Sequence, residues 1–291
     1  MIRPSQADFT GVQDFYRSNP FPGYDLSKYA VREDLYRAAN PYTLLLDLHI
    51  PLGARVLELG CGTGQLACLL ALKGRHVVGV DFSETSLRKA RDLKERLGLD
   101  RVELRHASVT EVRREAEEEP YDVILCNGVI PCLPDAPGEI GRICREVADP
   151  GTIIVLGLYH TWGRLLFRLR RFVERRLPAK RGYGSIRTML VKDEDDPEKI
   201  ASWVADQIRP PIEVCYTAAA VRSWFADNGV DWVRSLPALP GDPGIAAGLF
   251  ARGEARRWGG FLRSLAELGW FWSLRRTGGY FVAIGRKERA A

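Results

Sequence analysis

The stretch 56-VLELGCGTGQ-65 places three glycines within five residues, directly after an apolar run. Glycine adopts backbone angles that other residues avoid, and it lets a ligand approach the main chain closely. An apolar strand, a glycine-rich turn and the start of a helix together favour a nucleotide-type ligand at a helix N-terminus. The stretch therefore predicts a ligand-binding turn at the end of a buried strand.

Strand-like and helix-like segments alternate around this turn. The expected strands are 55–59, 76–80, 102–105, 121–126 and 152–158. Between them, apolar residues recur at helical spacing, as they do from Leu87 to Leu97 after the cap residue Ser83. Fully apolar strands separated by amphipathic helices indicate a parallel sheet covered on both faces. We therefore predict a doubly wound, Rossmann-like α/β core.

The segments outside the core divide the chain into four expected parts. These are an aromatic N-terminal cap or flap (1–52), the core (53–159), a helical lid insertion (160–215) and C-terminal helices with two more strands (216–291). Those two strands would complete a seven-stranded sheet that is mostly parallel, with an antiparallel last strand. We expect the cap and the insertion to lie over the ligand.

Composition places the chain among ordinary globular proteins. It has 291 residues, 46% of them hydrophobic and 27% charged, with a net charge of +5. No apolar run approaches the ~20 residues that cross a bilayer, and the N-terminus lacks the apolar region of a signal peptide. The six cysteines show no zinc-ligand spacing, so we expect buried thiols in the cytoplasm and no metal.

The glycine spacing separates two classes of nucleotide-type ligand. Gly60, Gly62 and Gly64 form G-x-G-x-G, whereas NAD-dependent oxidoreductases carry G-x-G-x-x-G. Asp81 ends the second strand, where an acidic residue suits the ribose hydroxyls in either class. The spacing therefore disfavours an NAD-dependent enzyme.

Three motifs together resemble class I S-adenosylmethionine (SAM)-dependent methyltransferases. The run from Val56 to Arg91 resembles the first two motifs of that family, YDVILCNGVIPCLPD (121–135) its fourth-strand motif, and DPGTIIVLGLY (149–159) its fifth-strand motif. The resemblance covers roughly residues 54–160. It implies SAM as cofactor, S-adenosylhomocysteine (SAH) as product, and methyl transfer as the reaction.

The resemblance also implies a set of cofactor-binding residues at the carboxyl edge of the sheet. The glycine loop would hold the cofactor, an acidic residue its ribose and an aromatic ring its adenine. Ser108 stands where such enzymes commonly have an Asp that contacts the adenine amine. The implied residues are Glu58, Gly60, Cys61, Gly62, Gly64, Asp81, Phe82, Ser108, Asn127 and Gly128.

The outer segments resemble one bacterial subgroup of these enzymes, for which we know no settled substrate. The shared features are NPFPGYD (19–25), GLY-x-x-x-GR (157–164) and W-x-x-DQ (203–207) with a downstream E-x-x-x-T. Members of the subgroup often carry histidines after strand four, where this chain has Ile130-Pro131-Cys132. We therefore expect no catalytic base from that loop.

Methyl transfer needs an aligned nucleophile and, for a hydroxyl or an amine, removal of a proton. Tyr159 and His160 follow the fifth strand, and a histidine there suits a base, although it could equally cap a carbonyl group. Asp206 and Gln207 lie in the expected lid, where they serve either catalysis or local hydrogen bonding. These four residues are our catalytic candidates.

Two further features have two readings each. Tyr24 and Tyr29 either touch the cofactor from a flap or pack the N-terminal segment onto the sheet. A basic amphipathic helix over 164–177 carries Arg164, Arg168, Arg171 and Arg175 at helical spacing. Its arginines are either solvated or directed at an acidic substrate, a membrane surface or nucleic acid.

The lid favours an enclosed pocket, and so a methyltransferase that acts on an O, N or C atom of a small molecule. One alternative is a tRNA or RNA methyltransferase that uses the basic helix 164–177. A second alternative is a catalytically idle SAM-binding protein. The sequence sets neither the acceptor nor the oligomeric state.

Overall fold

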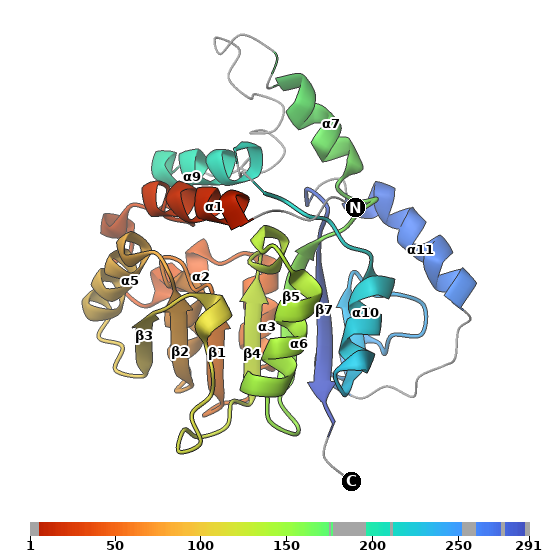
Figure 1. The fold of residues 1–291 in the computed structure, drawn as a ribbon. Coiled ribbons are helices and arrows are strands. Elements are labelled where there is room, and N and C mark those ends of the chain that lie inside the picture. The colour runs from red at the N-terminus through yellow and green to blue at the C-terminus, as the bar shows by residue number, and fades with distance from the viewer. Residues whose placement is uncertain are drawn as a thin grey trace.

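A seven-stranded sheet forms the centre of the molecule, with strands in the order β3-β2-β1-β4-β5-β7-β6 (Figure 1). The computed structural model of the protein describes residues 6–174, 176, 196–209, 212–251, 260–274 and 277–288. The strands are β1 (Arg55–Leu59), β2 (His76–Asp81), β3 (Val102–His106), β4 (Val123–Asn127), β5 (Ile153–Tyr159), β6 (Val230–Leu236) and β7 (Tyr280–Lys287). The first five are parallel, and β7 runs antiparallel to β5 and β6. The predicted fold class is confirmed.

Helices cover both faces of this sheet. They are α1 (Gln6–Ser18), α2 (Glu33–Ala38), α3 (Pro41–His49), α4 (Gln65–Ala71), α5 (Glu84–Arg96), α6 (Ala136–Arg142), α7 (Leu165–Glu174), α9 (Pro197–Ile208), α10 (Ala218–Asp227) and α11 (Gly260–Ser273). Alternate residues of β1 belong to two different core clusters: Leu57 packs with residues of α6 and α10, and Val56 with residues of α2 to α5. This alternation is what a strand buried on both faces requires.

Local signals start several helices where the sequence places them. The Ser83 hydroxyl accepts a hydrogen bond from the Ser86 amide at the start of α5, and Thr217 caps α10 in the same way. Gly64 precedes α4 with a left-handed backbone (φ 76°). The turn after β1 therefore leads directly into a helix N-terminus, as the glycine-rich stretch predicts. None of the helices in the described ranges is both long and apolar enough to span a bilayer.

Two segments distant in sequence form a layer over the carboxyl edge of the sheet. Helices α1 and α9 lie side by side there (Figure 1). The amide of Gly23 donates to Ser202 Oγ (2.7 Å), and the rings of Phe21 and Trp203 meet edge to face at 5.0 Å. We call the described residues 10–25 and 196–209 the cap layer. It covers the edge where the glycine turn lies.

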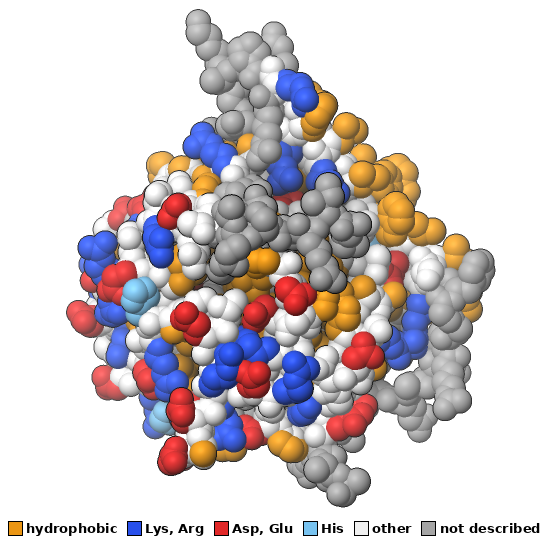
Figure 2. All heavy atoms as spheres, in the orientation of Figure 1, with side chains coloured by type: hydrophobic (Ala, Val, Ile, Leu, Met, Phe, Trp, Pro, Cys, Tyr) orange, Lys and Arg blue, Asp and Glu red, His pale blue; other side chains and the backbone are white. Residues whose placement is uncertain are grey.

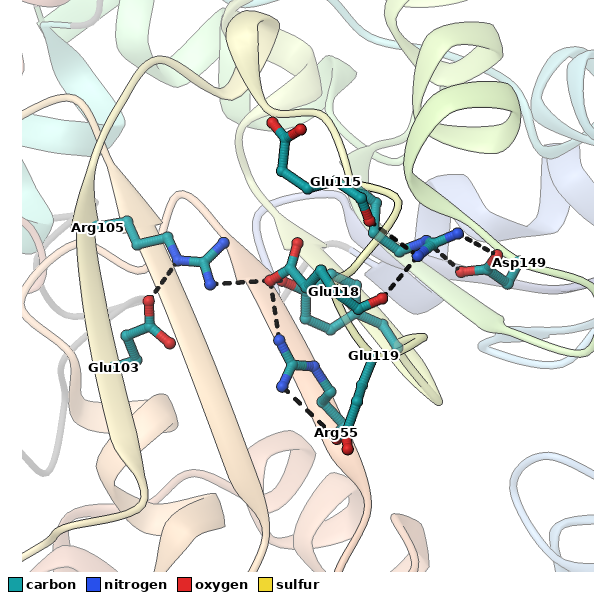
Figure 3. A network of polar contacts seen from close by, with 9 residues as sticks. Arg55, Glu103, Arg105, Glu115, Glu118, Glu119 and Asp149 are labelled. Atoms are coloured by element: carbon teal, nitrogen blue, oxygen red, sulfur yellow. Dashed lines mark hydrogen bonds and ion pairs between the residues drawn. The ribbon is translucent and has the colours of Figure 1, made fainter.

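A network of charged side chains fixes the loop that leads into β4 (Figure 3). Glu118 Oε1 accepts hydrogen bonds from Arg55 Nη2 (2.8 Å), Arg105 Nη2 (2.8 Å) and Tyr121 Oη (2.6 Å). Arg114 extends the network to Asp149, just before β5. One partly buried carboxylate thus ties the loop to β1 and β3.

Candidate active site

The glycine turn has a conformation that requires glycine at each of its three positions. Gly60, Gly62 and Gly64 all have positive φ (75°, 52° and 76°). A Cβ atom on Gly60 would lie 2.3 Å from Val129 Cγ2, and one on Gly62 would lie 2.1 Å from the Phe21 carbonyl oxygen. The turn is therefore held between the loop after β4 and the cap layer, with no room for side chains.

Asp81 fastens this turn to the end of β2. Its two carboxylate oxygens accept hydrogen bonds from the amides of Gly62 (2.9 Å) and Ser83 (2.8 Å). Burial raises the pKa of Asp81, and these backbone bonds oppose the rise. Each carboxylate oxygen has a second lone pair, so Asp81 can still accept from a ligand hydroxyl. Half-buried Phe82 follows it.

Two buried polar atoms near this turn lack a partner within the described part of the chain. They are Glu58 Oε2, at the end of β1, and Asn127 Nδ2, at the end of the neighbouring β4. Burial and the charge of Asp81 raise the pKa of Glu58 to about 8. Buried polar atoms normally have partners, so this pair suits a ligand that brings both a donor and an acceptor.

Other expected cofactor residues contact the protein itself. Ser108 Oγ lies 2.8 Å from Thr110 Oγ1, at the start of a short helix. The side chain of Cys61 is buried against Gly79, which leaves its backbone in the turn. The amide of Gly128 donates to the carbonyl oxygen of Gly157 (2.9 Å).

Both N-terminal tyrosines pack beneath the glycine turn. Tyr24 and Tyr29 are 2% and 3% exposed, and their rings meet edge to face at 5.0 Å. Tyr24 Oη donates to the carbonyl oxygen of Thr63 (2.9 Å), and Gln65 Nε2 donates to Tyr29 Oη. Their surroundings match the packing role, which was the alternative to cofactor contact.

His160 has no exposed surface, and protein groups occupy both of its ring nitrogens. The amide of Gly163 donates to Nδ1 (3.3 Å), so Nε2 carries the proton and donates to Glu267 Oε2 (3.0 Å). Glu267 in turn accepts from the amides of Ala218 and Ala219 at the start of α10. This geometry argues against the expected role as a base. His160 instead joins β5 to α10 and α11.

The other three catalytic candidates meet in one cluster. Gln207 Nε2 donates to Asp206 Oδ2 (2.7 Å) and lies 2.9 Å from Tyr159 Oη. Tyr16 Oη, from α1, donates to Asp206 Oδ1 (2.6 Å). We call Tyr16, Tyr159, Asp206 and Gln207 the cap cluster. Burial raises the pKa of Asp206, and hydrogen bonds from Tyr16 and Gln207 oppose the rise.

Tyr16 was not a predicted catalytic residue, and no local signal marks it. Its partner Asp206 is 190 residues away in sequence. The carbonyl oxygen of Tyr16 also accepts from Ser83 Oγ (3.4 Å), beside Asp81 and Phe82. Tyr16 therefore links the end of β2 to the cap cluster.

A row of aromatic rings joins the cap cluster to Asn127. Tyr159 and Tyr280 meet edge to face at 5.9 Å. Tyr280 Oη (3.2 Å) and Tyr42 Oη (2.8 Å) both donate to Asn127 Oδ1. A Cβ atom on Gly157 would lie 1.8 Å from Tyr280 Oη, so the glycine in the GLY motif makes room for this contact.

The basic helix is oriented differently from the expected solvated row of arginines. Arg164 has no exposed surface; its Nη2 lies 2.5 Å from Glu213 Oε2, and its guanidinium lies 3.9 Å from the centre of the Tyr159 ring. Arg171 Nη1 pairs with the same carboxylate (3.1 Å). The expectation of a solvated row is wrong for both residues. Arg175 and Leu177 lie outside the described residues.

Comparison with known proteins identifies the central part of the chain. Residues 52–180 match the family model described as a methyltransferase domain. The ubiquinone biosynthesis O-methyltransferase of Hahella chejuensis is 39% identical over 99 residues, which are 34% of this chain and 40% of that protein. Its Marinobacter nauticus counterpart is 35% identical over 115 residues, 38% of this chain and 48% of that protein. The alignments thus cover less than half of these relatives.

Solved structures match over nearly the whole chain, at low identity. The 1,6-didemethyltoxoflavin-N1-methyltransferase of Burkholderia thailandensis, solved with its named substrate and SAH, has a TM-score of 0.53 at 15% identity and covers 99% of this chain and 93% of its own. The magnesium protoporphyrin IX methyltransferase of Synechocystis, solved with SAH, has a TM-score of 0.52 at 15% identity, with 97% and 100% covered. At this identity the likeness concerns the fold.

Proposed function

Residues 52–180 are a class I SAM-dependent methyltransferase domain, and from this premise we propose that the protein methylates a small molecule. The observation that carries the proposal is the cap cluster. It places a half-buried carboxylate, held by two hydrogen bonds, in the cap layer above the glycine turn. Such a carboxylate suits proton removal from an acceptor.

The residues at the carboxyl edge fit SAM. Glu58 Oε2 and Asn127 Nδ2 are the acceptor and the donor that its amino-acid end requires. Asp81 would accept from the ribose hydroxyls, and Phe82 would lie against the adenine. Bound SAM supplies a methyl group already activated on a sulfonium, so the protein has only to position the acceptor and receive its proton.

Asp206 is the proposed proton acceptor. The acceptor's proton would pass to an Asp206 carboxylate oxygen, directly or through the Tyr16 hydroxyl that donates to it at 2.6 Å. Gln207 holds the other carboxylate oxygen in place (2.7 Å). The raised pKa of Asp206 makes it a better base than an ordinary carboxylate. The cap layer would exclude water from this step.

Charge and burial narrow the class of acceptor. Arg164 and Arg171 share Glu213, and the Asp206 carboxylate lies near the same charges, so the two arginines and the two carboxylates together carry no net positive charge for an anionic substrate. Val12, Cys132 and Ile212 form a buried apolar cluster against which Tyr16 packs. An uncharged, largely apolar molecule with one hydroxyl or amine suits these surroundings. The O-methyltransferase name of the curated relatives supports an oxygen as the acceptor atom.

Substitution of Asp206 tests this assignment. The assay measures SAH formed from SAM in the presence of a panel of phenols, catechols, alcohols and amines. Asp206→Asn keeps the size of the side chain and removes the base, so turnover should fall by about 10²- to 10⁴-fold while SAH affinity stays unchanged. Asp14→Asn, at an exposed position on the neighbouring helix α1, is the matched control and should keep full turnover.

Two results would contradict the proposal. Full turnover by Asp206→Asn would remove the carboxylate from the chemistry. SAH formation with RNA, and with none of the small molecules, would favour the RNA methyltransferase over the small-molecule enzyme.

A further inference from the structure

Helices α7 and α11 expose a continuous row of large apolar side chains. Figure 2 shows them as an orange patch on the upper right of the molecule, over these two helices. Their exposed fractions lie between 42% and 64%, unusual for side chains of this size. We call this set the apolar ridge: Trp162, Leu165, Leu169, Phe172, Val173, Leu262, Leu265, Leu268 and Trp272.

The members of the ridge recur at helical spacing, so they form one continuous face of each helix. On α7, Leu165, Leu169 and Phe172 follow i, i+4, i+7, while Phe167 within the helix and Arg164 just before it are buried. On α11, Leu265, Leu268 and Trp272 follow i, i+3, i+7, while Trp270 is buried. Each helix thus has one anchored face and one apolar face turned outward.

The two helices meet at one junction, so their outward faces adjoin. A Cβ atom on Gly163, just before α7, would lie 2.9 Å from Leu274 Cβ, just after α11. The ring of His160 also meets that of Trp270 at 4.8 Å. From this junction the helices diverge along the edge of the molecule (Figure 1). The ridge therefore spans both helices as one surface.

Positive charge borders the ridge. Arg168 is exposed on α7, and Arg176 is exposed just after it. The Arg176 guanidinium lies 3.4 Å from the centre of the Phe172 ring. Glu267, the acidic residue of α11, is buried against His160. The partner of such a surface should combine an apolar layer with negative charge.

We propose that the apolar ridge docks on the surface of an anionic lipid membrane. Leucine, phenylalanine and tryptophan side chains would enter the boundary between headgroups and acyl chains, and the bordering arginines would meet the phosphates. A symmetric pair of ridges on two copies of this chain would instead bring the same arginines together, where like charges repel. Charge complementarity thus selects the membrane over a second copy.

Vesicle binding tests this docking without reference to catalysis, so it can fail independently of the proposed function. The probes are sedimented vesicles of phosphatidylcholine alone, or of phosphatidylcholine with phosphatidylglycerol. Wild-type protein should bind the anionic vesicles, less so as salt rises, and bind the neutral ones at least 10-fold more weakly. The double variant Leu169→Glu/Leu265→Glu, one change on each helix, should lower anionic binding at least 10-fold.

Exposed leucines elsewhere provide a matched control. Leu48 and Leu52 are 71% and 74% exposed and lie on and after α3, away from the ridge. Leu48→Glu/Leu52→Glu adds the same charge and should bind anionic vesicles as the wild type does. Both double variants change exposed positions, so both should unfold at the wild-type temperature.

Three outcomes would overturn the proposal. The first is wild-type protein that does not bind anionic vesicles. The second is an equal loss of binding in the two double variants, which would show that the loss comes from the added negative charge and not from the apolar ridge. The third is a wild-type dimer, seen by sedimentation velocity, that Leu169→Glu/Leu265→Glu dissociates without any vesicle binding. That result would assign the ridge to a second copy of the chain.

Discussion

Asp206 and His160 are both titratable residues near the same edge of the sheet, but they differ in their exposure and in their hydrogen-bond partners. His160 has both ring nitrogens engaged and no exposed surface. Asp206 is half-buried, and burial raises its pKa. Only Asp206 therefore has the access that a proton acceptor needs. Sequence position suggests both residues, whereas hydrogen-bond partners separate them.

Substitution of His160 should affect stability rather than chemistry. His160→Ala removes one of the three donors to the buried Glu267 carboxylate and opens a cavity beside Trp270, so the free energy of unfolding should fall by about 2–4 kcal/mol. Urea unfolding measures this loss. Turnover per folded molecule, with an acceptor from the panel above, should stay within a factor of about three. A 100-fold loss of turnover at unchanged stability would restore His160 as the base.

Residues of the cofactor edge were predictable because their signal is local. Glu58, the three glycines and Asp81 lie within 24 consecutive positions, and β1 and β2 bring them together as neighbours. Tyr16 lacked such a signal because its role depends on a hydrogen bond across 190 positions. The proposed cofactor residues thus come from local motifs, and the proposed acceptor residues come from long-range contacts.

Helix α7 shows where periodicity is ambiguous at the scale of an element. The spacing correctly predicts an amphipathic helix, with arginines opposite leucines. It does not tell which face meets the protein when a buried carboxylate such as Glu213 can pair with two arginines of the helix and the residue before it. In the structure, Arg164 is anchored and Leu169 is exposed, the reverse of the usual arrangement.

The loop before β4 depends on one carboxylate, which gives a prediction about pH. Burial by itself raises the pKa of Glu118, but hydrogen bonds from Tyr121 and Arg105 outweigh it, and the net pKa is lowered. A lowered folded pKa stabilises the fold above the unfolded value of about 4.3, and this contribution disappears as the pH falls through the folded pKa. The stabilisation by Glu118 is therefore complete at neutral pH.

Glu118→Gln should lower the free energy of unfolding by about 1–3 kcal/mol at pH 7, because two arginines and Tyr121 lose a charged acceptor. The difference from wild type should shrink as the pH drops below about 4. Urea unfolding across this pH range measures it, with the exposed Glu117→Gln as control. A difference that is constant with pH would show that the charge of Glu118 contributes nothing.

At the scale of the whole molecule, the core was predictable and the cap layer was not. Alternating apolar strands and amphipathic helices specify a doubly wound sheet, because each element must bury its own apolar face. The cap layer depends on contacts such as Gly23 with Ser202, between segments nearly 180 residues apart. The sequence leads us to expect a lid formed by the two outer segments, but it does not predict the contacts that join them.

Helix α7 connects the proposed membrane-docking surface to the proposed acceptor site. Arg164 lies just before the first residue of α7, and its guanidinium lies over the ring of Tyr159 in the cap cluster. A membrane under the apolar ridge would then lie next to the segment that carries the proposed acceptor site. Docking and catalysis remain separate claims, since vesicle binding and turnover measure them independently.

The central claim is that the glycine turn and Asp81 hold SAM, and calorimetric titration with SAH tests it most directly. The account predicts saturable binding of one SAH per chain, no binding of NAD, and an affinity about 10- to 150-fold weaker in Asp81→Ala, the loss of a charge-assisted hydrogen bond. Asp100→Ala, at an exposed position, should bind as the wild type does. Absence of SAH binding, or undiminished binding by Asp81→Ala, would contradict the account.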